Sequence, residues 1–118
     1  MTRFKDGPAQ GQTLMLKRCP IFLRIVEKAG KFDALDQASD TPAADEKIYV
    51  YHITGLPGHC HVNMGRGRGG FYPLAEYSLH PIQPGDETLR NPDAWHAWVF
   101  SAATPADHEL MRKYNKER

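Results

Sequence analysis

The chain has 118 residues, of which 41% are hydrophobic and 25% are charged, and its formal net charge is +1. This length fits one ordinary domain, because a single core generally occupies about 100 to 200 residues. The composition excludes a disordered chain, and the small net charge disfavours nucleic-acid binding driven by bulk charge. No apolar run approaches the roughly 20 residues of a bilayer span, and the N-terminus lacks the apolar region of a secretory signal. We therefore expect a cytoplasmic protein that makes no membrane contact.

The first third of the chain reads as strands. Residues 2–5 and 12–18 alternate polar and apolar side chains around a glycine-containing turn at 6–11, which predicts a hairpin. After Pro20, residues 21–26 alternate again, and the turn at 29–31 ends this strand.

Three further strands are expected in the middle of the chain. Residues 32–46 are acidic and poor in apolar side chains, which is typical of a solvated loop, and Phe32, Ala34 and Leu35 would place a short segment of it against the core. Residues 47–53 and 59–64 read as strands joined by a tight turn at 55–58, giving a hairpin over 47–64. Residues 71–80 return to strand character, with Pro73 indicating a sheet edge or a bulge.

The C-terminal third changes to helical periodicity. Asn91 followed by Pro92 is a typical helix start, and Thr104 with Pro105 repeats it. Trp95 and Trp98 have the spacing of core anchors on an amphipathic helix. The sequence thus predicts a single α+β domain over residues 1–118, strand-rich over 1–82 and helical over 91–117. Its antiparallel sheet should have about five strands, with two C-terminal helices.

The segment from Gly65 to Gly70 holds four glycines and two arginines, and Phe71 and Tyr72 follow it. Ordering four glycines costs much backbone entropy, so we expect an exposed tip between two strands. Guanidinium groups and aromatic rings are common anchors of protein interfaces, and they also contact phosphate and stack on bases. The predicted binding residues are Arg66, Arg68, Phe71 and Tyr72.

A second candidate site consists of histidines. His59 and His61 point to the same side of a strand, as a pair of metal-binding imidazoles must, and His52 would lie across the predicted hairpin. Cupin-type metal sites use the same His-x-His spacing but add a carboxylate a few residues later, and here the next acidic residue is Glu76. Two solvent-facing histidines opposite Cys60 and Val62 explain the pattern with fewer assumptions, so we predict no metal and no cofactor.

The two cysteines, Cys19 and Cys60, are too few for a disulfide-stapled scaffold, and we predict two reduced, partly buried thiols. Cys60 lies between two histidines in sequence. On a strand those neighbours project to the opposite face, so the sequence gives no activated nucleophile.

One sequence pattern resembles small uncharacterised proteins of phages and prophages. The resemblance covers about residues 4–80. Its motifs are Phe4-x-Asp6-Gly7-Pro8-x-x-Gly11-x-x-Leu14-x-Leu16-x-Arg18-x-Pro20, Phe22-Leu23-Arg24, Asp33-Ala34-Leu35-Asp36-Gln37, Asp40-Thr41-Pro42, Gly70-Phe71-Tyr72 and Ala75-Glu76-Tyr77. Proteins of this kind are typically accessory factors, and the resemblance carries no catalytic residues with it.

These observations favour a non-enzymatic phage or prophage accessory protein that binds a host, defence or phage protein in the host cytoplasm. The acidic segment between Asp33 and Glu46 would supply a second, oppositely charged contact. Two alternatives stay open: a module that binds RNA or single-stranded DNA with the arginine tip, and a small metal-dependent β-barrel enzyme centred on His59 and His61.

Overall fold

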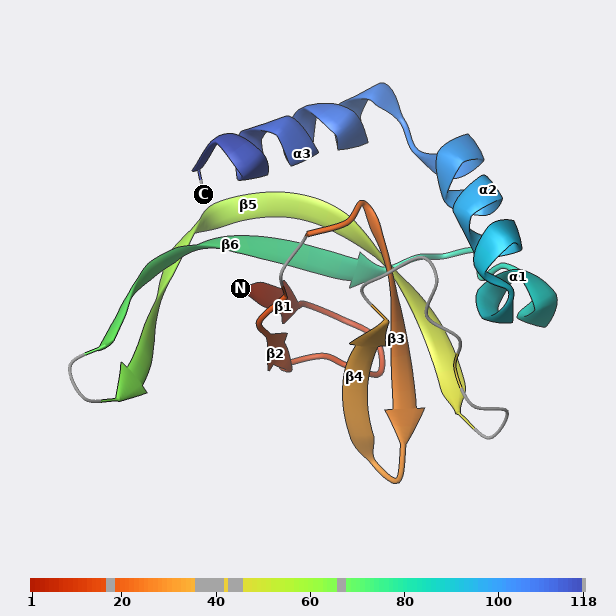
Figure 1. Cartoon of the computed structure of the whole chain (residues 1–118), viewed down its shortest axis with the longest axis horizontal. Helices are drawn as coiled ribbons and strands as arrows, with labels where there is room; N and C mark the ends of the chain where they lie inside the picture. Colours follow the sequence, from red (N-terminus) through yellow and green to blue (C-terminus); the bar gives the residue numbers. More distant parts are fainter. Residues whose placement is uncertain (17–18, 36–41, 43–45, 66–67, 118) are drawn as a thin grey trace.

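The computed structural model describes residues 1–16, 19–35, 42, 46–65 and 68–117, with the side chains at 59–65, 68–69, 71–73 and 115–117 outside the description. Strands and helices both form, which confirms the α+β prediction (Figure 1). The elements are β1 (Thr2–Phe4), β2 (Thr13–Leu14), β3 (Phe22–Lys28), β4 (Lys31–Leu35), β5 (Lys47–Gly65), β6 (Arg68–Leu79), α1 (Asp86–Arg90), α2 (Pro92–Ala102) and α3 (Pro105–Glu117).

The strands form one sheet in the order β2-β1-β6-β5-β3-β4. Every neighbouring pair is antiparallel except β1 with β6, which is parallel and pairs Thr2 with Ala75 and Phe4 with Tyr77. The sheet has six strands where about five were expected, and one of its pairs is parallel. Strand β4 was not expected, whereas two expected strands are merged in β5. The parallel pair joins segments from opposite ends of the sheet-forming sequence.

The predicted N-terminal hairpin is confirmed by the pairing of β1 with β2. Its connecting loop is fixed by the hydroxyl of Tyr51, which accepts from the Ala9 N–H at 2.9 Å and donates to the Asp6 carbonyl at 2.9 Å. Gly7, at φ +73°, packs so closely here that an added Cβ would lie 2.7 Å from the Tyr51 oxygen. The loop thus depends on a glycine for both its backbone conformation and its close approach.

The turn predicted at 29–31 is also present, and it joins β3 to β4. Ala29 and Gly30 have positive φ values of 53° and 78°, which suits the right-handed twist of a two-residue hairpin. The expected loop after it is instead the edge strand β4. Phe32 and Ala34 pack against the core while Lys31 and Asp33 are exposed, so this short strand alternates despite its low apolar content.

The predicted hairpin over 47–64 is wrong, because β5 runs without interruption from Lys47 to Gly65. In place of a turn, the pairing of β5 with β6 shifts its register between Ile53 and Gly58, where the sequence contains glycine and proline. Glycine and proline suit such β-bulges as well as they suit turns. Pro73, expected at an edge or bulge, pairs with His59 in a part of β6 that lies before the pairing with β1.

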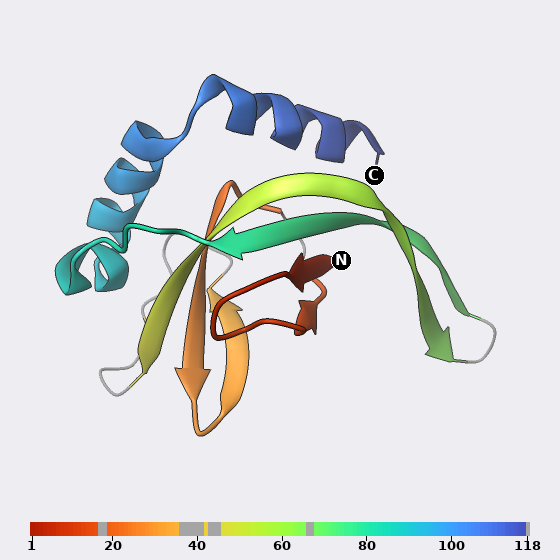
Figure 2. The same ribbon diagram turned by 180° about the vertical axis from the view of Figure 1, so that it is seen from behind.

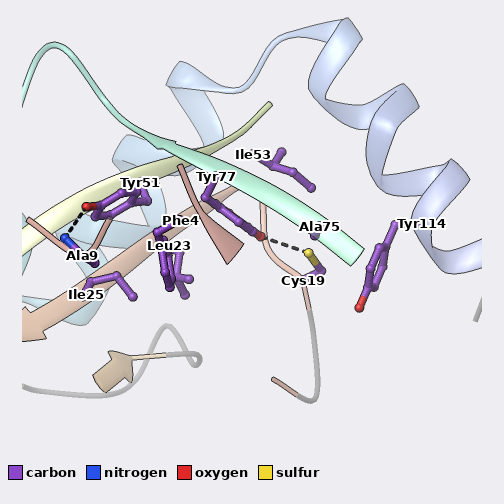
Figure 3. Packing of buried hydrophobic residues seen from close by; sticks show 10 residues of the cluster. All are labelled: Phe4, Ala9, Cys19, Leu23, Ile25, Tyr51, Ile53, Ala75, Tyr77 and Tyr114. Atoms are coloured by element: carbon purple, nitrogen blue, oxygen red, sulfur yellow. Dashed lines mark hydrogen bonds between the residues drawn. The ribbon is translucent and has the colours of Figure 1, made fainter. Parts of the chain in front are cut away.

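Two groups of buried side chains cover the two faces of the sheet. Alternation along β3 sends Leu23 and Ile25 into one group and Phe22 into the other. The larger group fills the inside of the curled sheet (Figure 3). It comprises Phe4, Ala9, Cys19, Leu23, Ile25, Tyr51, Ile53, Ala75, Tyr77 and Tyr114. The smaller group comprises Phe22, Val50, Leu89 and Trp95, and places α1 and α2 against the other face.

Both expected helix starts are confirmed. The Asn91 side chain accepts from the N–H groups of Asp93 and Ala94, and the Thr104 hydroxyl accepts from the N–H of Asp107. An additional short helix, α1, precedes them. Trp95 is buried and Trp98 packs beside it, as predicted. Within the described residues, none of the three helices is long and apolar enough to cross a bilayer.

Gly7 and Gly11 provide a matched pair for testing the docked loop, because both have positive φ but nothing lies within 4 Å of a Cβ built on Gly11. We expect Gly11→Ala to lower the free energy of unfolding by about 1 kcal/mol through backbone strain. Gly7→Ala should cost about 1 to 3 kcal/mol more, because it also clashes with Tyr51 and Leu79. Urea unfolding measures both values, and equal losses would contradict the close docking of this loop.

Candidate functional site

The outer halves of β5 and β6 form a two-stranded arm, here defined as residues 58–65 and 68–74. Pairing runs from Gly58 opposite Leu74 to Gly65 opposite Arg68. Within the described residues, β3 pairs with β5 only up to His52 and β1 reaches β6 only at 75–77, so the arm has no third strand. The two views show this ribbon extending away from the rest of the sheet (Figures 1 and 2).

The predicted binding residues belong to this arm. Arg66 lies outside the described residues. Arg68, Phe71 and Tyr72 have their backbones in β6, and their side chains lie outside the description. The structure thus brings three of the four backbone positions into the arm, with Arg68 at its end. Residues 55–75 contain two arginines and no acidic residue, so this stretch carries only positive formal charge.

The register assigns the arm residues to two faces, because directly opposed residues share a face of an antiparallel pair. His61 lies opposite Phe71 and His59 opposite Pro73, which places these positions on one face. Cys60 lies opposite Tyr72, at positions of the other face. The predicted alternation of His59 and His61 with Cys60 therefore agrees with the strand pairing.

The proposed approach of His52 to His59 and His61 is wrong, because no hairpin lies between them. All three residues belong to β5, and six residues of strand lie between His52 and His59, which places them roughly 20 Å apart. The side chains of His59 and His61 lie outside the description. Among the described residues, no three His, Cys, Asp or Glu side chains are grouped so that they could hold a metal ion.

His52 belongs to a different group, which we call the His52 cluster: Phe22, His52, His80, Trp98 and Asp107. The His52 ring stacks on Phe22 with centroids 4.7 Å apart, and His80 contacts both rings edge-on. Nε2 of His52 lies 2.6 Å from Oδ1 of Asp107. One carboxylate thus connects β5 to the first turn of α3.

Asp107 also completes the start of α3. Its second oxygen accepts from the Thr104 N–H at 2.9 Å, and its own N–H donates to the Thr104 hydroxyl at 3.3 Å. This is a reciprocal capping arrangement. Burial raises the pKa of Asp107, but the bonds from Thr104 and His52 outweigh it and hold that pKa below its ordinary value of 3.8. The carboxylate is therefore ionised in the neutral pH range.

The His52 cluster resembles part of a catalytic triad, since Ser78 is directly opposite His52 in the β5–β6 register. No hydrogen bond joins Ser78 to His52 in the described part of the chain, although Asp107 is in place. The Phe22 ring instead packs against both the His52 ring and the Trp98 ring. The geometry supports a packed link between sheet and helix in preference to an activated nucleophile.

A buried arginine fixes the other helices to the same sheet face. Arg24 is completely buried, and its guanidinium donates to the Leu89 carbonyl at 3.0 Å. Its Cζ also lies 5.0 Å from the centroid of the Trp95 ring. The alternation of the strand places Arg24 on the other face of the sheet from Leu23 and Ile25, but the sequence does not indicate that the charge of Arg24 is buried. The partners come from α1 and α2, more than 60 residues later.

Comparison of the chain with protein-family models, with curated proteins and with solved structures found no match. The arm and the His52 cluster are therefore interpreted from their own geometry and chemistry.

Variants at Thr104 and Asp107 distinguish the contribution of the helix cap to stability from that of the contact with His52. We expect Thr104→Ala to lower the free energy of unfolding by about 1 kcal/mol, because it removes one capping bond. Asp107→Ala should cost about 2 to 4 kcal/mol, because it also removes a charge-assisted bond to His52. Thermal and urea unfolding measure both changes. Equal losses would mean that the His52 contact does not stabilise the fold.

Proposed function

We propose that this chain is a non-enzymatic phage or prophage accessory protein that binds a host, defence or phage protein with the β5–β6 arm. The resemblance of residues 4–80 to small phage proteins supports the origin. The arm supports the mode of action, and it is the observation that carries this proposal.

The unpaired edges of the two-stranded arm suit the binding of a partner. A two-stranded hairpin is only marginally stable by itself in water, and an open strand edge is a template for another strand. In the described residues, each arm strand pairs with the other and with no third strand. A partner protein that adds a strand along this edge would satisfy those backbone groups and extend the sheet.

The arm's residue types suit such an interface. Arg66, Arg68, Phe71 and Tyr72 are of the types that most often anchor protein–protein contacts. With no acidic residue between 55 and 75, the arm favours an acidic surface on the partner. The acidic segment from Asp33 to Glu46 would offer a second contact of opposite sign; Asp33 is exposed on β4, and most of that segment lies outside the described residues.

The experiment is capture of partners from the native host with purified wild-type and variant chains. Arg66→Ala combined with Arg68→Ala should lower partner recovery at least tenfold while leaving the unfolding transition unchanged. The matched control is Lys31→Ala with Lys47→Ala. It removes two exposed positive charges at the starts of β4 and β5, away from the arm at the other end of β5. The control should retain wild-type recovery.

Equal losses in the two double variants would point to general electrostatics and contradict a specific role for the arm. Full recovery by the arginine double variant would reject the proposed anchors. A Gly70→Pro substitution then tests the arm backbone itself, because proline has no N–H for an added strand and is disfavoured within a ladder.

Single-stranded nucleic acid is a second candidate partner for the same arm, favoured by its two arginines, its glycines and its lack of acidic residues. If this is the partner, the logarithm of affinity for an RNA oligonucleotide should fall with the logarithm of salt concentration. Removing both arginines should flatten that slope by about 1.4, which is about 0.7 for each lost phosphate contact on a single strand. An unchanged slope would reject this candidate.

A further inference from the structure

Helix α3 is attached to the sheet at two places. At its first turn Asp107 bonds His52, and further along Tyr114 is buried beside Cys19, Ala75 and Tyr77 (Figure 3). Ala75 directly follows the arm residue Leu74 in β6. In both ribbon views α3 lies along the stretch of β5 and β6 from which the arm departs (Figures 1 and 2). The helix thus supports the root of the arm.

His80, which is partly buried, lies beside the first of these attachments. Its ring centroid is 5.3 Å from Phe22, 5.5 Å from Trp98 and 5.9 Å from His52, and all three contacts are edge-on. Its Nδ1 is buried, and in the described part of the chain this atom has no hydrogen-bond partner. Protonation would put an unbonded N–H and a positive charge among aromatic rings, which costs free energy.

The charged neighbours of His80 come from two elements. Burial lowers the pKa of His80 below its ordinary value of 6.5, the charge of His52 on β5 lowers it further, and Asp107 on α3 opposes them. On β3, the guanidinium of Arg24 is directed to Leu89 and Trp95. On α2 and α3, His96 and His108 are exposed.

We propose that α3 supports the arm and is released by acid. Protonation of His80 opens the contact between His52 and Asp107 in the first turn of α3, and the helix leaves the sheet. The sign follows from linkage. A neutral His80 is favoured while α3 is docked, whereas a solvated His80 takes up a proton more readily. Docking is therefore strongest above pH 6.5 and weakens as the pH falls below it. The consequence for partner binding rests on the function proposed for the arm, but the movement of α3 does not.

Hydrogen exchange of the full chain between pH 7.5 and pH 5.0 tests this inference without any partner. After correction for intrinsic rates, the amides of α3 should lose protection by up to about tenfold per pH unit below 6.5, since one linked proton changes an equilibrium by no more than that. The β3 amides of Leu23 and Ile25 serve as the internal reference and should keep their protection. Loss of protection in β3 together with α3 would mean global unfolding and would overturn the proposal.

The variant His80→Phe keeps an aromatic ring against Phe22 and Trp98 but cannot be protonated. We expect it to abolish the acid-induced exchange of α3, while the control His108→Ala, on the same helix but exposed, should retain it. Acid release that persists in His80→Phe would overturn the role of His80.

A second measurement keeps the proposal testable if His80→Phe folds poorly. In the wild-type chain, the titration of the His80 ring protons followed by NMR should have its midpoint below pH 6.5, in the range where α3 loses protection. A midpoint at or above pH 6.5 would contradict the coupling. Normal acid release with no partner captured would reject only the function proposed for the arm, so the two failures are distinguishable.

Discussion

Strand β5 extends far beyond the stretch that β3 pairs, and this extra length gives the sheet its arm. β3 pairs with β5 from Lys47 to His52, β6 pairs with β5 from Tyr51 onward, and the two pairings overlap at Tyr51 and His52. Beyond the bulges between Ile53 and Gly58, β6 is the only strand that accompanies it in the described residues. The same strand therefore has a buried half that belongs to the core and an outer half that forms the arm. Bulges bend and twist a ladder without ending it, which is why one strand can serve both purposes.

Sequence patterns predicted those parts of the fold that depend on nearby residues. The turns at 6–11 and 29–31 and the starts of α2 and α3 require particular residues at fixed short spacings, and these predictions are confirmed. The segment from Gly55 to Gly58 was misinterpreted because glycine and proline mark bulges and turns alike. The parallel pairing of Thr2 with Ala75 could not be predicted, because it depends on where the whole sheet places its first strand. Strand β4 had a detectable signal, the alternation of Phe32 and Ala34, but its acidic continuation obscured it.

The same distinction applies to the candidate sites. The exposed tip predicted over 65–70 is wrong for Arg68, Gly69 and Gly70, because these residues lie in β6 and pair with β5, and residues 66–67 lie outside the described residues. The bond between His52 and Asp107 joins residues 55 positions apart, and no local pattern indicates it. Thr104 and Asp107 could be recognised only as a helix start, which uses one oxygen of the carboxylate. What the second oxygen contacts is decided by how α3 crosses the sheet.

Directional polar contacts occur where the sheet meets each of its coverings. Arg24 holds α1 and α2 through Leu89 and Trp95, His52 holds α3 through Asp107, and Tyr51 holds the N-terminal loop through Ala9. Burial of apolar surface is non-directional, so it would allow a helix to shift across the sheet at little cost. A hydrogen bond to a buried group has one favourable geometry and is costly to leave unmade. These contacts therefore fix the orientation of α3 on the sheet. The two strands of the arm supply little packing of their own, so the bulged part of the β5–β6 ladder that leads into the arm is oriented by what packs against it.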